Sequence, residues 1–159
     1  MPTLPVVHQE RNVPEGMQTL VGFTPDYFDV FTIHTDMARE RTPEQWARAL
    51  VEHAAGPAGQ FVWRVVLGLR LDTSPESVGG WRVGGRGDDW IRLEASSWCL
   101  TANVTLLLSD DRLSVGTFGR YDRAVAERVW QPLSVVHRRA MPGLLLLAAK
   151  RVGAEAAAA

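Results

Sequence analysis

The chain has 159 residues, 46% of them hydrophobic, and a formal net charge of -1 at pH 7. This length predicts a single domain, and the apolar content is sufficient for a hydrophobic core. A nucleic-acid-binding protein usually carries a dense basic stripe, whereas the nearest candidate here is only the pair Arg138 and Arg139. We therefore expect no nucleic acid among its partners.

Cysteine content and apolar runs narrow the class further. Cys99 is the only cysteine, which excludes an intrachain disulfide and a cysteine-based metal site. We expect no metal and no cofactor, since the sequence has no metal-ligand cluster and no dinucleotide-binding glycine motif. Residues 1–16 lack the apolar core of a signal peptide, and the apolar run 144–149 is far shorter than the about 20 residues of a membrane span. These features predict a cytoplasmic protein without a membrane span, and they leave homo-oligomer formation open.

The first third of the chain predicts one strand and a pair of helices. Residues 1–25 contain several prolines and predict an irregular lead-in. Aromatic and β-branched residues alternate within residues 27–35, which predicts a strand. Thr42, followed by proline and then by Gln45, is typical of a helix start, and that helix should end near Ala54.

The next segments are a second helix and a sheet. A continuous apolar run predicts a helix over residues 59–71, with a strand as the alternative. The glycine-rich residues 84–87 lack the spacing of a phosphate-binding loop, so we interpret them as a tight turn between strands. Three closely linked strands follow at residues 90–95, 98–108 and 113–121, which predicts an antiparallel meander.

The last predicted element is a long helix that begins after Asp122. Apolar residues recur at helical spacing and form one continuous stripe. Its members are Val125, Val129, Leu133, Val136, Ala140, Leu144 and Leu147. Pro132 and Pro142 each remove one backbone hydrogen bond, so we expect kinks near Arg128 and Arg138. Residues 153–159 predict a disordered tail.

Four segments in this order resemble a known family. They are residues 26–31, 44–49, 80–83 and, on the last helix, Val129-Trp130 together with 136–139 and 142–145. The ordered set, which spans roughly residues 26–151, resembles the actinobacteria-rich domain-of-unknown-function family numbered 2867. That family is similar to the helix-grip group, which includes START lipid-transfer domains and polyketide cyclases. The resemblance implies a cavity between a curved sheet and the C-terminal helix, but no established reaction.

The predicted fold class is therefore α+β and helix-grip-like. We expect one domain over residues 26–152, in which a curved antiparallel sheet wraps a long kinked C-terminal helix and two shorter helices follow the first strand. Strand alternation places one set of side chains on the floor of the implied cavity. This set comprises Trp98, Leu100, Ala102, Val104, Val115, Thr117 and Tyr121. Leu133 and His137 would line the cavity from the helix, although the helix could equally fill this face of the sheet.

Few residues suggest chemistry. His137 could serve as a general base or anchor, or simply as a histidine at the edge of the core. Tyr121 could donate to a ligand, or pack in the core with its hydroxyl at the rim. Arg92 and Glu94 share a strand face, and we interpret them as a weak surface ion pair.

These patterns support three hypotheses of different kinds. The first is a small-molecule-binding domain that holds an apolar or aromatic ligand. The second is a cyclase, dehydratase or isomerase on the same fold, in which Tyr121, His137 or Arg120 would polarise a carbonyl. The third is an interaction module that binds another protein through exposed tryptophans and has no open cavity. A fold alone does not decide among them.

Overall fold

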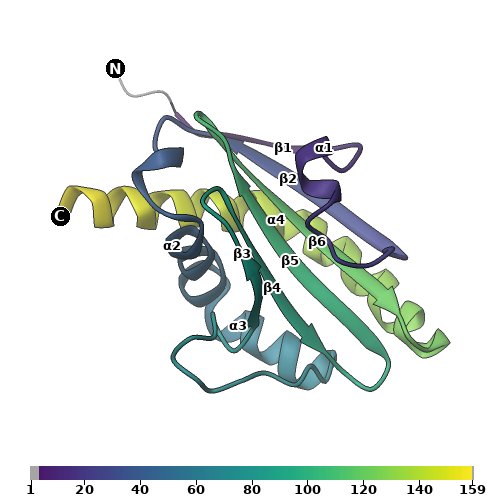
Figure 1. Ribbon diagram of the computed structural model, residues 1–159. Helices are drawn as coiled ribbons and strands as arrows, with labels where there is room; N and C mark the ends of the chain where they lie inside the picture. The colour runs from purple at the N-terminus through teal and green to yellow at the C-terminus, as the bar shows by residue number, and fades with distance from the viewer. Residues whose placement is uncertain (1–3, 159) are drawn as a thin grey trace.

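The structure is a computed structural model that describes residues 4–158. Six strands form one curved antiparallel sheet in the order β1-β2-β6-β5-β4-β3 (Figure 1). The strands are β1 (Val6–Glu10), β2 (Tyr27–His34), β3 (Arg82–Arg86), β4 (Trp90–Ser96), β5 (Leu100–Leu108) and β6 (Arg112–Tyr121). The predicted α+β class and the predicted meander of three strands are confirmed.

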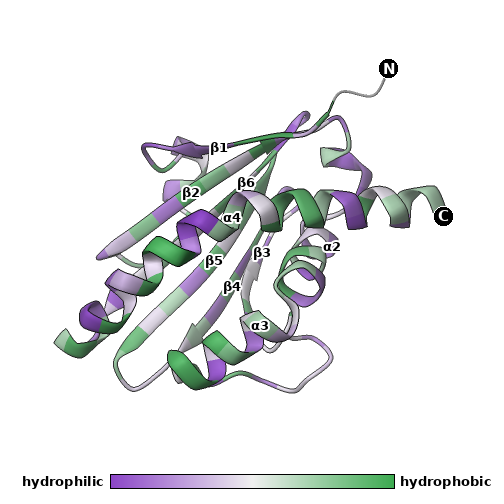
Figure 2. Ribbon diagram, turned by 180° about the vertical axis from the view of Figure 1, so that it is seen from behind, coloured by the Kyte–Doolittle hydropathy of each residue, from purple (hydrophilic) through white to green (hydrophobic). Residues whose placement is uncertain are grey.

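The helices cover the two faces of the sheet unequally. The α-helices are α1 (Glu15–Gln18), α2 (Pro43–Arg48), α3 (Gly56–Phe61) and α4 (Ala124–Ala158). The π-helical turn η2 (Ala49–Ala54) follows α2, and the π-helical turn η3 (Val62–Val66) follows α3. A short 3-10 turn, η1 (Ala38–Glu40), precedes α2. Figures 1 and 2 show α2, α3 and α4 on the same face of the sheet, with α1 on the opposite face. This is a helix-grip-like layout, because the sheet curves around the side that carries the long helix.

The start of α2 follows the local sequence signal. The Thr42 hydroxyl accepts a hydrogen bond from the Gln45 N–H at 3.2 Å, and the Gln45 side chain accepts one from the Thr42 N–H at 2.9 Å. These two bonds form the predicted capping box. The chain then turns at Gly56, whose φ of 54° is open mainly to glycine. The second helix starts here, three residues before the predicted start, and its last π-helical turn ends at Val66.

Strand β3 corrects the prediction of a turn over residues 84–87. Residues as far as Arg86 belong to the strand, and the turn to β4 spans residues 87–89. The glycines allow side chains from β4 to lie across the backbone of β3. A Cβ atom at Gly84 would lie 2.1 Å from the Glu94 carboxylate, and one at Gly85 would lie 2.9 Å from the Trp90 ring. These glycines therefore let side chains of β4 approach the backbone of β3 closely. The interpretation of glycine as a turn residue does not predict this role.

The predicted irregular lead-in is also wrong over its described residues 4–25, because residues 6–10 and 15–18 form β1 and α1, while residues 1–3 lie outside the described part of the chain. β1 pairs with β2 through backbone hydrogen bonds. Such pairing requires no alternation of apolar residues, so the sequence of β1 carries no strand pattern. α1 packs on the outer face of the sheet, where Met17, Val21, Val30 and Phe118 form a second buried cluster. Residues 13–23 therefore help to bury the outer face of the sheet, and the domain does not begin at residue 26.

Polar side chains from the sheet hold this N-terminal segment in place. Arg92 Nη1 donates to the Leu20 carbonyl at 2.7 Å, and Asn103 Nδ2 donates to the Val21 carbonyl at 2.6 Å. Arg92 Nε also contacts Glu94 at 2.8 Å, and both side chains are partly buried. The predicted surface ion pair is thus part of the contact that fixes the N-terminal segment to the sheet.

α4 is longer than predicted. It runs through residues 153–158 of the predicted disordered tail, whose last residue, 159, lies outside the described part of the chain. Val152 is fully buried, and Arg151 pairs with Glu155 one helical turn later at 2.9 Å between Nε and Oε1. Alanine also favours the helical state, so the alanine-rich end extends the helix. Figure 2 shows that α4 changes direction near its middle, as expected for the region of Arg138 and Pro142, while the kink near Arg128 stays a prediction.

α4 also presents a different face to the sheet from the one predicted. Its buried residues follow the same spacing, but they lie one residue further along the chain. They are Ala126, Trp130, Ser134, Met141, Leu145, Ala148, Ala149 and Val152. Val129, Val136 and Leu147 from the predicted stripe are instead 37%, 60% and 54% exposed. Small residues such as Ala126 and Ser134 let the helix approach its neighbours, whereas hydrophobicity alone had selected the larger valines.

The buried N-terminal segment leads to a test of stability. Met17→Ala should lower the free energy of unfolding by roughly 2–5 kcal/mol, because it empties space in a fully buried cluster. Urea denaturation followed by circular dichroism measures this difference. Glu15→Ala, an exposed change on the same helix, should alter it by less than about 0.5 kcal/mol. Equal stabilities of the Met17 variant and the unmodified protein would contradict the packing described above.

Candidate functional site

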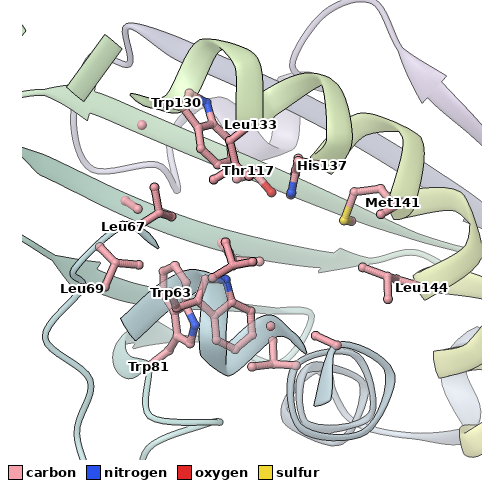
Figure 3. A pocket seen from close by; sticks show the side chains of 18 of the residues that line it. Trp63, Leu67, Leu69, Trp81, Thr117, Trp130, Leu133, His137, Met141 and Leu144 are labelled. Carbon is pink, nitrogen blue, oxygen red and sulfur yellow. The ribbon is translucent and has the colours of Figure 1, made fainter. Parts of the chain in front are cut away.

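An apolar cavity lies between the concave face of the sheet and the helices that cover it (Figure 3). Its volume is about 310 Å³, within the size range typical of small-molecule sites. Sheet residues at the cavity include Leu100, Ala102, Val104, Val115 and Gly119. The helix α4 contributes Trp130, Leu133, Val136, His137, Ala140 and Leu144, and the opposite wall includes Val62, Trp63 and Leu67. The helix side chains thus border an open space and do not fill the whole sheet face.

The floor of the cavity is open because small residues meet there on neighbouring strands. Ala102 of β5 pairs with Gly119 of β6 and with Ala95 of β4. A Cβ atom at Gly119 would find its nearest neighbour 3.6 Å away, so this position has room to spare. One wall is filled by large side chains, because the rings of Trp63 and Trp81 meet edge to face with their centroids 5.6 Å apart.

Seven of the nine predicted site residues lie at this cavity. They are Leu100, Ala102, Val104, Val115, Thr117, Leu133 and His137. Five come from adjacent strands and two from α4, so strand alternation placed the sheet residues on the correct face. The structure therefore brings together residues separated by up to 37 positions in the chain, between Leu100 and His137.

Trp98 and Tyr121 do not line the cavity. β5 begins at Leu100, and Trp98 lies in the preceding turn with 64% of its surface exposed and Arg123 over its ring. The Ser97 hydroxyl holds this turn by accepting a hydrogen bond from the Leu100 N–H at 3.1 Å, so the strand alternation begins two residues later than predicted. Tyr121 closes β6 and packs at the edge of the core.

Arg120 is another residue that the structure moves away from the cavity. Its Nε donates to Asp122 at 2.7 Å, and its guanidinium lies over the Phe23 ring of the N-terminal segment. Phe23 packs on the outer face of the sheet, so Arg120 cannot polarise a ligand inside the cavity.

One polar cluster lies at the wall of the cavity, where Tyr27 and His137 are lining residues. The Asp29 carboxylate is almost fully buried, and His137 Nε2 lies 3.1 Å from Asp29 Oδ2. The Tyr27 hydroxyl donates to the same carboxylate oxygen at 2.5 Å. A buried carboxylate without partners would destabilise the fold by several kcal/mol, so these two partners are required for its position.

The environment of Tyr27 favours its protonated form. Burial, followed by the nearby Asp29 charge and the hydrogen bond to it, raises the pKa of Tyr27 well above its ordinary value. Arg138 Nη1 donates to the Tyr27 hydroxyl at 3.3 Å and opposes this effect. The Trp130 ring lies edge-on to the Tyr27 ring at 5.2 Å and tilted to the His137 ring at 5.4 Å. The ring of Trp130 therefore packs against two members of the cluster from the side of α4.

Sequence reasoning missed Asp29 and Tyr27, although a signal was present. Phe31 and Ile33 are buried in the main core, so the alternation of β2 places Asp29 and Tyr27 on the same inward face. An acidic residue at an inward strand position needs a partner. The partner, His137, is 108 positions away and was not linked to Asp29 in the sequence.

The cavity wall offers few other polar groups. Thr117 and His137 lie side by side there (Figure 3), while the remaining described lining residues are apolar or aromatic. Within residues 4–158, no three His, Cys, Asp or Glu side chains are placed to hold a metal ion. Over the same residues, no helix has an apolar stretch that would cross a bilayer. The site is thus suited to a largely apolar molecule that makes polar contacts at one place on the wall.

Comparisons with protein-family models, with curated proteins and with solved structures give no match for this chain.

The Tyr27 environment predicts a pH effect on stability. The unfolded chain releases the Tyr27 proton near pH 10, whereas the folded protein retains it because the pKa is raised. The unfolded state then binds fewer protons, so stability should fall as the pH rises above about 10. Tyr27→Phe should lack this contribution, which chemical denaturation at a series of pH values measures. Tyr121→Phe serves as the comparison, and this variant should still show the loss of stability at high pH that Tyr27 causes.

Proposed function

We propose that the protein binds a small, largely apolar molecule in the cavity between the sheet and α4. The main support is a single observation: an apolar space of about 310 Å³ that touches one polar cluster. Small-molecule sites typically combine an apolar wall with a few polar groups that orient the ligand. The resemblance to family 2867, the cytoplasmic location and an apolar or aromatic partner form part of the same proposal.

The packing of α4 favours a ligand site over a filled core. An empty space of this size destabilises a fold, because its lining atoms lose contacts. Ala102 and Gly119 nevertheless keep the floor open, and Val136 is both a lining residue and 60% exposed. An exposed apolar side chain at the cavity wall is consistent with an entrance beside α4.

The tryptophans give less support to an interaction module. Among the six tryptophans, only Trp98 is largely exposed, while Trp46, Trp81 and Trp130 are buried. An apolar docking surface usually joins several such side chains in one patch. The ligand-binding proposal accounts for the positions of three tryptophans, since Trp63, Trp81 and Trp130 all border the cavity.

A second candidate function is an enzyme of the cyclase, dehydratase or isomerase type. It is favoured by two titratable lining residues, Tyr27 and His137, with a buried carboxylate between them. A histidine oriented by a carboxylate is a common arrangement for proton transfer. Tyr121 and Arg120 no longer support this candidate, because neither borders the cavity.

Filling the floor should abolish binding. Ala102→Trp places an indole in the open space, and uptake of an apolar fluorescent probe should fall at least about tenfold because the volume is lost. Fluorescence titration measures the affinity, and circular dichroism verifies the fold. Ser96→Trp is the matched control, because Ser96 is exposed at the end of β4 and does not line the cavity. Unchanged probe binding by the Ala102 variant would contradict the proposed site.

Native mass spectrometry of the protein purified from its own host tests the same proposal without a chosen probe. We expect a retained small molecule that leaves on denaturation and is absent from Ala102→Trp. Retention of the same molecule by both proteins would place it elsewhere on the chain.

A further inference from the structure

We propose that the ligand of this cavity is electrically neutral and carries a hydroxyl group, which hydrogen-bonds to His137 and Thr117. This inference rests on the proposed function, because it specifies the ligand of the same cavity. It is drawn from which polar atoms of the described lining residues have partners and which do not. The indole Nε1 atoms of Trp81 and Trp130 have no partner, but both are sealed within the protein and cannot reach a ligand. His137 and Thr117 each carry an unpartnered atom that is not sealed.

The first unpartnered atom is a nitrogen of His137. Nε2 is engaged by Asp29 at 3.1 Å, whereas Nδ1 has no hydrogen-bond partner among residues 4–158 and is not sealed from solvent. In the neutral imidazole, the nitrogen that faces the carboxylate carries the proton, so the other presents a lone pair. Asp29 therefore orients His137 as an acceptor, and a ligand must supply the donor.

The second unpartnered atom is the hydroxyl of Thr117. This side chain lies beside His137 at the cavity (Figure 3), and its Oγ1 has no partner in the described part of the chain. A threonine hydroxyl can donate one hydrogen bond and accept others. A ligand hydroxyl could thus donate to His137 Nδ1 and accept from Thr117 Oγ1, which satisfies both groups at once.

The charges around the cavity disfavour an anionic ligand. No Arg or Lys is among the described lining residues, and Arg138 is directed to Tyr27 and Ser134. A ligand carboxylate at His137 would lie close to the Asp29 charge without a free cation to balance it.

A cationic ligand is equally disfavoured. The Asp29 carboxylate is the nearest acidic group, but it is 1% exposed and already contacts Tyr27 and His137. An ammonium group in the cavity would therefore lose its hydration without reaching the carboxylate. A neutral ligand with one hydroxyl is the chemistry that remains.

Three ligands of the same ring size test this inference. We expect 2-naphthol to bind the unmodified protein at neutral pH at least about tenfold more tightly than 2-methoxynaphthalene, which cannot donate to His137 and would cover that acceptor without pairing it. The anion 2-naphthoate should bind more weakly than either. Displacement of the apolar probe, supported by calorimetry, gives the three dissociation constants.

Two variants assign the preference to the named groups. Thr117→Val keeps the shape of the side chain and should reduce the preference for 2-naphthol over its methyl ether several-fold. His137→Leu should abolish the preference while 2-methoxynaphthalene binding is retained. If loss of the Asp29 partner prevents that variant from folding, the ligand series on the unmodified protein and on Thr117→Val still decides the question.

Equal affinity for 2-naphthol and its ether would overturn the inference, as would tightest binding of 2-naphthoate. Failure of all three ligands to bind would also overturn it. Uptake of the apolar probe separates the two proposals, because probe binding without a hydroxyl preference leaves the proposed function standing.

Discussion

The buried carboxylate of Asp29 constrains the rest of the site. Its charge lies on the inward face of β2, where it has less than 2% exposure and no contact with bulk water. Such a group is tolerated only when its oxygens accept hydrogen bonds. Tyr27 comes from the same strand, but His137 must come from α4, so the carboxylate links the sheet to the long helix at this point.

That link is consistent with the face that α4 buries, which is shifted by one residue from the predicted face. The predicted stripe placed His137 at its edge, whereas on the observed helix His137 lies between Trp130 and Met141 and faces the sheet. Both faces have almost the same apolar spacing, so hydrophobic periodicity alone does not separate them. The contact between Asp29 and His137 is made only on the observed face, and on that face Val129 and Val136 are exposed.

The sequence predicted those features that depend on neighbouring residues. The Thr42 capping box, the meander and the inward set from Leu100 to Thr117 arise from local hydrogen bonds or strand alternation. Features that depend on distant partners were missed. β1 is held by backbone pairing with β2, and Asp29 meets a histidine 108 positions away, so neither has a local pattern. Trp98 was misplaced by only two residues, because a serine-capped turn interrupted the alternation.

The open space itself has a structural origin. α4 packs along η2 in its second half and against β2 and β6 elsewhere, as Figures 1 and 2 show, while α2 covers part of β4 and β5. Between these supports, Ala102 and Gly119 provide no side chain large enough to reach the helix. A bulky residue at either position would fill the interior and improve packing. Their small size instead leaves His137 and Thr117 facing unoccupied volume, and this combination distinguishes the arrangement from an ordinary core.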